Sequence, residues 1–251
     1  MTYYIESLCH QGNYRKNNED ALSYGMDEAS GCFWMLVADG MGGHNAGEVA
    51  SNMLVSKVEK QWQALHESTS QNMVNFDWSN WIATQLNDAN LDILQAATND
   101  EQLKGMGTTG VLMVVCDNTC YIGWVGDTRA YFLHKNTLKQ VTTDHTMIQV
   151  LLKKGAITAL EAKNANTNNL LSQAIGVTQK IDVDTLSFNI EENDVIMLST
   201  DGLHDYLSDE EISQYLSDFS EERAICDDMV ERALSQSSKD NLTLGVLKLL
   251  A

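Results

Sequence analysis

The chain of 251 residues contains no proline at all. Proline restricts an unfolded chain, so its absence leaves the unfolded state more conformational entropy and predicts modest thermal stability. Cysteine is scarce too: the five cysteines are odd in number and scattered, which indicates reduced thiols in a cytoplasmic protein rather than a disulfide framework. The N-terminal residues have no basic region or apolar core, and no apolar run approaches membrane-spanning length. We therefore expect a cytoplasmic protein with no membrane contact.

Positive charge is the third shortage. Lys and Arg number 16 against 35 Asp and Glu, which gives a formal net charge of −19. This balance argues against nucleic acid and against an anionic membrane surface as partners. An anionic substrate would need local positive charge, which bound metal ions can supply. The hydrophobic content of 43% is enough to bury a substantial core, so we expect one domain over residues 1–251.

One acidic residue stands between an apolar run and a group of glycines. Residues 32–38 predict a buried strand, and Asp39 follows them with Gly40, Gly42 and Gly43 close behind. Glycines let a ligand approach the backbone and let carbonyl oxygens turn towards it. Mg²⁺ and Mn²⁺ prefer such oxygen ligands. The stretch is therefore either a metal-binding strand end or an ordinary Asp-Gly hairpin turn.

Hydrophobic spacing predicts the other elements. Amphipathic helices are expected over residues 46–65 and from residue 77 or 78 to 97. Ser208 before three acidic residues predicts a capped helix start, and a last helix is expected over 221–234. Strands are expected over residues 3–8, 21–24, 32–38, 109–116, 119–125, 129–134, 183–188, 195–200 and 242–247.

The polar segment at residues 143–176 does not fit the strand pattern around it. It contains two short helix candidates, residues 147–154 and 158–164, followed by an Asn-rich run. Such a segment is either a mobile flap or an ordinary surface excursion.

Acidic residues recur where strands begin or end. The set comprises Asp39, Asp127 and Asp201 at the ends of expected strands, and Glu19, Asp20 and Asp240 just before others. Antiparallel pairing would bring all of them to one edge of the sheets. Like charges crowded in this way repel one another unless divalent cations compensate. Paired cations can also activate water for displacement at phosphorus, and Arg15 would provide the bidentate fork that a phosphoryl group requires.

Six motifs occur in order along the chain. They are Arg15-x-x-Asn18-Glu19-Asp20 and the residues at 39–44 (DGMGGH), 105–109 (GMGTT), 126–129 (GDTR), 199–203 (STDGL) and 239–241 (KDN). Together they resemble the motifs of metal-dependent type-2C serine/threonine protein phosphatases, and the pattern at Met41 and His44 is similar to the bacterial branch. The resemblance implies an α+β fold: a four-layer αββα sandwich of two antiparallel sheets flanked by helices, with a dinuclear metal site between the sheets. It also implies that residues 143–176 form the flap that helps select substrates.

The resemblance further implies a role for each acidic residue. The implied ligands of two Mn²⁺ or Mg²⁺ ions are Asp39 bridging both, the Gly40 carbonyl on one, and Asp201 and Asp240 on the other. Glu19 and Asp20 would lie in or just behind this shell and contact the ions through water. Asp127 with Asp201 would hold a third, weaker ion. Arg15 would bind the substrate phosphate.

Two departures from the family pattern affect the site. Many eukaryotic members have a candidate proton donor where this chain has Met41, so His44 becomes the candidate general acid, although a His here could equally pack at the helix start. In the flap, a His-Pro pair and basic residues are replaced by Ala165, Asn166, Asn168 and Gln173. His10, His145 and His204 are expected to be structural or solvent residues.

The implied activity is that of a cytoplasmic, monomeric phosphoprotein phosphatase. Its substrates would be phosphoserine and phosphothreonine in proteins, the products of a cognate serine/threonine kinase. Two alternatives belong to other classes: a metal-dependent hydrolase of small phosphate esters, and a scaffold that keeps the fold but has lost the chemistry. A degenerate scaffold would have lost metal ligands, whereas this chain keeps Asp39, Asp201 and Asp240.

Overall fold

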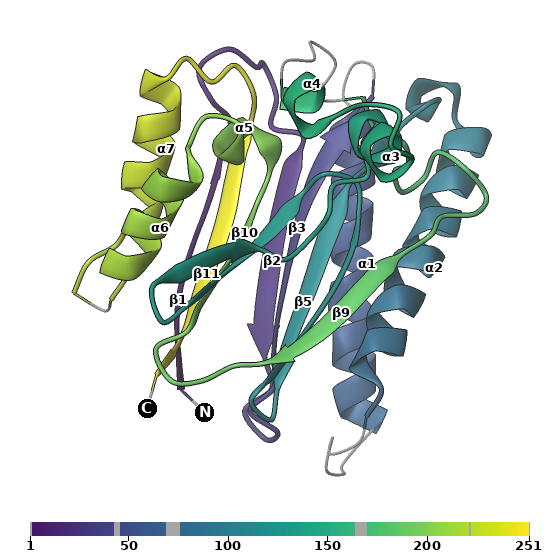
Figure 1. Cartoon of the computed structure of the whole chain (residues 1–251). Helices are drawn as coiled ribbons and strands as arrows, with labels where there is room; N and C mark the ends of the chain where they lie inside the picture. Colours follow the sequence, from purple (N-terminus) through teal and green to yellow (C-terminus); the bar gives the residue numbers. More distant parts are fainter. Residues whose placement is uncertain (1, 43–45, 69–75, 164–169, 221, 251) are drawn as a thin grey trace.

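The chain folds into two antiparallel sheets that lie face to face between two pairs of helices (Figure 1). This computed structural model describes residues 2–42, 46–68, 76–163, 170–220 and 222–250. One sheet has the order β1 (Thr2–His10), β11 (Leu242–Leu250), β10 (Val195–Ser199), β7 (Arg129–His134) and β8 (Thr137–Gln140). The other has the order β2 (Asp20–Met26), β3 (Phe33–Met41), β5 (Gly110–Cys116), β6 (Thr119–Val125) and β9 (Asp184–Asn189), with the short β4 (Gly107–Thr108) paired to β3.

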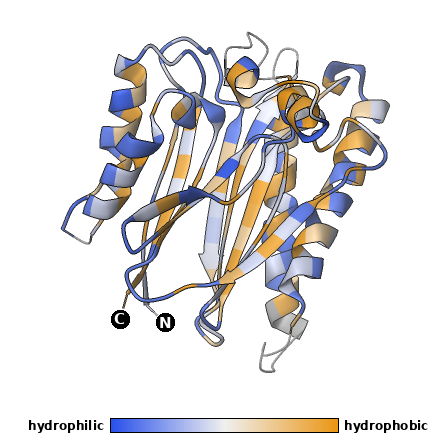
Figure 2. Ribbon diagram, in the orientation of Figure 1, coloured by the Kyte–Doolittle hydropathy of each residue, from blue (hydrophilic) through white to orange (hydrophobic). Residues whose placement is uncertain are grey.

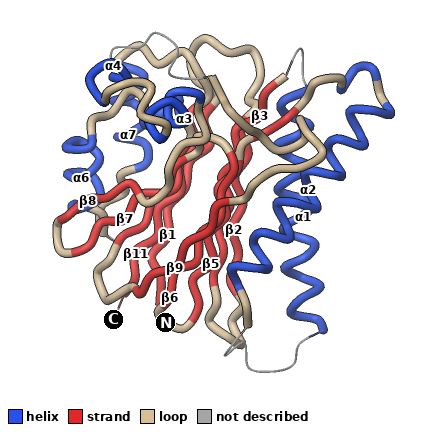
Figure 3. Tube along the Cα trace, turned by 45° about the vertical axis from the view of Figure 1, so that its right-hand side comes forward, coloured by secondary structure: helices blue, strands red, loops and turns tan. Residues whose placement is uncertain are grey.

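The remaining elements are helical. The outer layers are α1 (Ala46–Ser68) with α2 (Trp78–Asn99), and α6 (Asp209–Asp218) with α7 (Cys226–Ser235). Three short helices, α3 (Met147–Lys153), α4 (Ala159–Lys163) and α5 (Asp201–His204), lie at the end of the sheets where β3 ends (Figures 1 and 3), and a 3₁₀ turn spans Glu101–Leu103. The four-layer αββα sandwich implied by the motifs is thereby confirmed.

The central strand β3 explains how the layers are held together. Its residues alternate between two buried clusters: Phe33 and Met35 pack between the two sheets, whereas Trp34 and Leu36 pack against α1 and α2. Because both faces of the sheet are covered, β3 reads as a continuous apolar run rather than an alternating one. A third cluster fills the space between the other sheet and the α6–α7 pair. Figure 2 shows the apolar positions gathered on the strands and on the inner sides of the helices.

The α1–α2 pair is joined by aromatic packing as well as by the sheet beneath it. Trp62 of α1 stacks on Trp78 of α2 with ring centroids 5.6 Å apart, and Trp81 meets Trp62 edge-on at 6.0 Å. Asp77 caps α2, because its side chain accepts a hydrogen bond from the Asn80 backbone N–H at 3.0 Å. Across the described ranges, no helix carries an apolar stretch sufficient to cross a bilayer.

Several elements differ from the expectation. The sequence pattern does not predict β4, β8, α5 or the 3₁₀ turn at Glu101–Leu103. β8 follows a tight turn at Lys135 and Asn136, whose φ angles of 47° and 61° lie in the left-handed region. α7 begins at Cys226 rather than at residue 221, because the Glu6 carboxylate of β1 accepts hydrogen bonds from the backbone N–H groups of Ile225 and Cys226, at 2.9 and 2.8 Å. A residue more than two hundred positions away therefore sets where this helix starts.

The expectation of reduced thiols throughout is wrong for one pair. Phe33 pairs with Val115 in the β3–β5 ladder, which sets Cys32 opposite Cys116, and the two form a disulfide with their Cα atoms 4.5 Å apart. The two cysteines are 84 positions apart, so the sequence alone does not show that they are neighbours. The remaining cysteines, Cys9, Cys120 and Cys226, are free thiols.

Candidate active site

The acidic residues do meet at one end of the two sheets. Asp20 and Asp39 are direct partners in the β2–β3 ladder, because β2 starts where β3 ends. Asp201 is the first residue of α5, immediately beyond β10, and Asp240 lies just before β11. Asp127 occupies the turn between β6 and β7. The expected convergence of strand ends is therefore seen, with each carboxylate supplied by a different element.

Crowding and burial change the proton affinity of these carboxylates. Burial raises the pKa of Asp20 to about 7, and Asp201 and Asp240 add to the effect. Burial and the charge of Asp201 raise the pKa of Asp127 to about 7, while burial and Asp240 raise that of Asp201 to about 6. Burial, followed by the charges of Asp20 and Asp201, raises the pKa of Asp39 well above its ordinary value. The ionised carboxylates therefore repel one another, and a bound positive charge would relieve this repulsion.

Gly40 occupies a space that admits no side chain. A Cβ on Gly40 would collide with the backbone oxygens of Gly47 and Glu19. The Gly40 N–H donates to the Glu19 carbonyl at 3.1 Å, and the Ser51 hydroxyl of α1 donates to the same carbonyl at 2.6 Å. The glycine therefore allows β3, α1 and the strand entrance at Glu19 to approach one another closely.

Backbone and hydroxyl donors hold the two paired aspartates. The Asp39 carbonyl accepts hydrogen bonds from the Thr109 N–H at 2.8 Å and from the Thr108 hydroxyl at 2.9 Å. The Asp20 carboxylate accepts one from the Thr200 hydroxyl at 2.9 Å. That hydroxyl links the two sheets, since Asp20 belongs to β2 and Thr200 follows β10.

Arg15 supplies positive charge beside the carboxylates. Its Nη2 lies 2.6 Å from Asp240 Oδ2, and its side chain remains 48% exposed. The hydrogen bond to Asp240 raises the pKa of Arg15. A cavity of about 290 Å³ opens next to it, and its lining includes Asp201, Tyr206 and Lys239. The guanidinium can thus reach an anion that enters from solvent.

A second cavity lies between the edge and the segment at residues 143–176. Its volume is about 230 Å³, and it is lined by Asp127 and Asp201 on one side and by Ile148 and Leu152 of α3 on the other. Two isolated antiparallel β-bridges hold the segment. One joins Thr146 to Leu171 within it, and the other joins Ile175 to Thr108 of β4. The segment thus borders the acidic edge directly, although Ala165, Asn166 and Asn168 lie outside the described residues.

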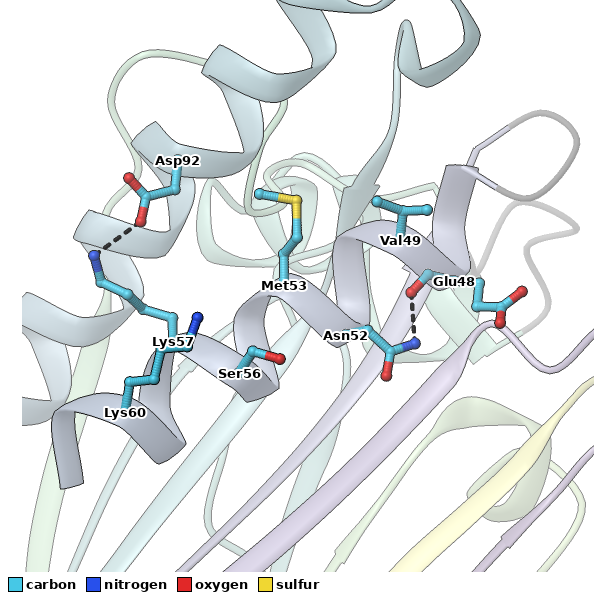
Figure 4. Close-up of a pocket in the computed structure, with 8 residues that line it drawn as sticks. All are labelled: Glu48, Val49, Asn52, Met53, Ser56, Lys57, Lys60 and Asp92. Carbon is cyan, nitrogen blue, oxygen red and sulfur yellow. Dashed lines mark hydrogen bonds and ion pairs between the residues drawn. The ribbon is translucent and has the colours of Figure 1, made fainter. Parts of the chain in front are cut away.

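A wider groove lies elsewhere, on the outer face of α1 and α2 (Figure 4). It measures about 700 Å³ and is lined by residues such as Met53, Lys57 and Asp92, the last two of which form an ion pair at 2.8 Å. None of the clustered aspartates lines it. Cavity volume alone would therefore misplace the site, whereas the carboxylates and Arg15 identify it.

The donor set suits hard divalent cations. Two buried carboxylate oxygens, Glu19 Oε1 and Asp201 Oδ1, have no hydrogen-bond partner among the described residues. A buried oxygen left in this way is costly unless a cation or water meets it. Within the same residues, no three His, Cys, Asp or Glu side chains surround one point closely enough to hold a metal unaided. Mg²⁺ and Mn²⁺ commonly complete their shells with carbonyls and water, so fewer side chains suffice.

Asn241 is a supporting residue whose role the sequence alone did not predict. Asn241 donates to the carbonyls of Gln11 and Asn17, at 2.8 and 3.0 Å, and accepts from the Glu19 N–H at 2.9 Å, so it fastens the loop that carries Arg15. The sequence feature that could have identified Asn241 is its position directly after Asp240 in the last motif. His44, the candidate general acid, lies outside the described residues.

Solved structures resemble this fold over the whole chain. Serine/threonine phosphatase Stp1 from Staphylococcus aureus is 28% identical with a TM-score of 0.89, and the match covers 100% of this chain and 96% of that one. The catalytic domain of serine threonine protein phosphatase PstP, in complex with two manganese ions, is 28% identical with a TM-score of 0.82, covering 99% of each chain. Fold and acidic edge together define the class of the molecule as that of the serine/threonine protein phosphatases.

Sequence comparison narrows the class to a family. A family model described as Protein phosphatase 2C matches residues 12–243. Serine/threonine phosphatase stp from Listeria welshimeri is 33% identical over 209 residues, which cover 83% of this chain and 81% of that protein. The chain belongs to the protein phosphatase 2C family. This confirms the resemblance carried by the six motifs, including its bacterial character.

Proposed function

We propose that the chain hydrolyses phosphoserine and phosphothreonine in proteins, using water and no covalent phosphoenzyme. The observation that carries this proposal is the cluster of aspartates with raised pKa values around Asp39, with Arg15 beside it. Such an edge attracts cations, and cations together with an arginine suit a phosphoryl group. The phosphatases that match the chain along most of its length support the same activity.

The metal ions of the proposal are two Mn²⁺ or Mg²⁺ ions. Their ligands would be Asp39, the Gly40 carbonyl, Asp201 and Asp240, with Glu19 contacting them through water, and Asp127 with Asp201 would hold a third ion. Bound cations would supply a water of lowered pKa and would offset the charge of the phosphoryl oxygens. The two manganese ions of the PstP structure support the metal and its number. The unpartnered oxygens of Glu19 and Asp201 support the choice of ligands.

Three residues would act on the substrate and its protons. Arg15 would bind the phosphate, because its planar fork offers several donors and Asp240 takes one of them. Asp20 would orient water at the edge, held by the Thr200 hydroxyl. His44 would protonate the leaving serine or threonine oxygen, since an imidazole changes charge near neutral pH.

We assign residues 1–251 to one phosphatase domain and residues 143–176 to a flap within it. The cavity that α3 shares with Asp127 and Asp201 supports a flap that contacts substrate. The working unit of the proposal is a monomer. Its substrates would be made by a serine/threonine kinase. The location of the proposal is the cytoplasm: three of the five cysteines are free thiols, as is usual there, whereas the Cys32–Cys116 disulfide is not.

The substrate class can be tested by competition between large and small phosphate esters. We expect kcat/KM for a phosphoserine or phosphothreonine peptide to exceed that for free phosphoserine and for nucleotides. Much faster turnover of the small esters would show instead a hydrolase of small phosphate esters. Failure to hydrolyse any of them, with Mn²⁺ and Mg²⁺ both supplied, would favour a scaffold.

A further inference from the structure

His145 lies at the point where the flap begins, yet it contacts segments from three other parts of the chain. Only 7% of its surface is exposed. Its ring stacks on Trp124, at the end of β6, with centroids 6.2 Å apart. The Trp124 indole N–H in turn donates to the Thr143 carbonyl at 2.9 Å. The imidazole is thus wedged between β6 and the first residues of the flap.

The hydrogen bonds of the ring determine which nitrogen carries the proton. Nδ1 receives the Gly126 backbone N–H at 3.1 Å and the Gln173 side-chain amide at 2.9 Å. Gln173 cannot be turned around, because its amide also pairs with both backbone groups of Asp182. Both partners of Nδ1 are therefore donors, so Nδ1 is the acceptor. The proton lies on Nε2, which faces the Asp184 carboxylate at 3.3 Å.

The same residue fixes the turn that carries Asp127. His145 and Gly126 exchange two hydrogen bonds: the His145 N–H donates to the Gly126 carbonyl at 2.9 Å, and the Gly126 N–H donates to Nδ1. Gly126 has φ +103°, and a Cβ there would meet the Thr109 side chain. This conformation is available to glycine and is held from outside by His145. The next residue is Asp127.

Both ends of the flap are held at this residue. The His145 carbonyl accepts a hydrogen bond from the Ser172 N–H at 2.8 Å, and the neighbouring Gln173 reaches its ring. Residues 145 and 172–173 therefore close the flap at its base. A single imidazole connects this closure with the Gly126–Asp127 turn.

We propose that His145 is a positioning residue that couples the placement of the flap to that of Asp127. This inference rests on the proposed function, in which Asp127 holds a metal ion and residues 143–176 form a flap. The ring acts through its Nδ1 acceptor: removing the acceptor frees the Gly126–Asp127 turn and the flap base together.

The test compares two replacements of His145. His145→Asn keeps an oxygen acceptor near the place of Nδ1, whereas His145→Leu keeps volume without an acceptor. In His145→Leu we expect kcat/KM on a phosphoserine peptide to fall about 10- to 100-fold, a loss typical of residues that orient metal-binding groups. His145→Asn should stay within about threefold of the wild type because its oxygen still accepts the Gly126 N–H. His134→Leu is the matched control, because it removes a histidine–aspartate contact of 2.8 Å at the far end of β7.

Trypsin cleavage gives a second measurement that needs no catalysis. Lys153 and Lys154, at the end of α3, are exposed. Below the melting temperature of every variant, His145→Leu should be cut there faster than the wild type, His145→Asn or His134→Leu. Equal activity and equal cleavage in His145→Leu and wild type would overturn the inference, as would losses in His145→Asn as large as those in His145→Leu. An inactive wild type would refute the proposed function instead, and cleavage would still decide whether His145 closes the flap.

Discussion

Asp39 shows what the site requires of a single residue. Four other aspartates, Asp20, Asp127, Asp201 and Asp240, act on its charge, and its side chain is half-buried. Its backbone carbonyl is fixed by Thr108 and Thr109, so the carboxylate cannot move away by turning the strand end. The residue is therefore held in a place where its own ionisation is unfavourable, and a positive charge bound in the site would favour that ionisation.

Replacing Asp39 by asparagine separates this charge from the shape of the side chain. In Asp39→Asn we expect Mn²⁺-dependent hydrolysis of a phosphoserine peptide to fall at least about 100-fold, because the carboxylate proposed to hold the metal ions is lost. Without metal, the variant should melt at the same temperature as the wild type or higher, because repulsion is relieved. Asp218→Asn, which removes a carboxylate from a surface ion pair with Arg223, is the control and should change neither activity nor the response to Mn²⁺. Near-normal activity of Asp39→Asn would refute its assignment as a ligand.

The position of the acidic residues could be predicted because it depends on local pattern. An acidic residue at a strand end, combined with antiparallel pairing, is enough to place Asp20 opposite Asp39. Asn241 and His145 could not be assigned in this way. Their partners lie far away in sequence, as with Asn241 and Glu19, which are 222 positions apart, and only the folded register brings them together.

Among the elements, α6 shows how local chemistry sets a boundary. Ser208 and Glu211 form a capping box: the Ser208 hydroxyl accepts from the Glu211 N–H at 3.2 Å, and the Glu211 carboxylate accepts from the Ser208 N–H at 3.0 Å. Both residues adjoin the helix start expected from the sequence. This boundary could be predicted because all of its contacts lie within one turn.

Removing this cap should cost stability without affecting chemistry. For Ser208→Ala we expect the free energy of unfolding to fall by about 1 kcal/mol, measured by urea denaturation. kcat/KM should remain unchanged, since α6 lies outside the site. Ser217→Ala, in the last turn of the same helix, is the matched control and should cost less than about 0.5 kcal/mol because alanine favours helix. An equal loss in the two variants would contradict the role of the cap.

Other elements depend on distant partners and could not be predicted so well. α7 starts where Glu6 of β1 meets it, and β8 exists because β7 offers it an edge. The Cys32–Cys116 pair follows from strand register, which the sequence pattern alone does not specify. For α7 and the disulfide, the missing information is a contact between segments far apart in sequence. For β8 it is the free edge of β7, to which a two-residue turn returns the chain.

At the scale of the whole molecule, stability and cation binding are coupled through the acidic edge. A carboxyl whose native pKa is raised keeps a proton that the unfolded chain has already lost, so its contribution to stability falls as pH rises. For Asp20 and Asp127, with native pKa values of about 7, this fall extends from about pH 4, the ordinary value, to about pH 7. Asp201, at about 6, acts in the same direction.

Metal binding should therefore stabilise the protein more at high pH than at low pH. We expect the rise in melting temperature on replacing chelator with excess Mn²⁺ to be small at pH 5 and large at pH 8, because cations bind the deprotonated carboxylates. In Asp39→Asn the rise should be reduced at both values. A metal-induced rise that is the same at pH 5 and pH 8 would contradict the coupling.

The acidic residues at this end of the sheets are proposed to hydrolyse phosphoproteins with the help of divalent cations. The most direct measurement is the release of phosphate from a phosphoserine peptide by the purified chain, with Mn²⁺, with Mg²⁺ and with chelator in excess. We predict turnover with at least one of the two metals, its loss in chelator, and its return when metal is added back. Turnover that persists undiminished in chelator, or none with either metal, would contradict the account.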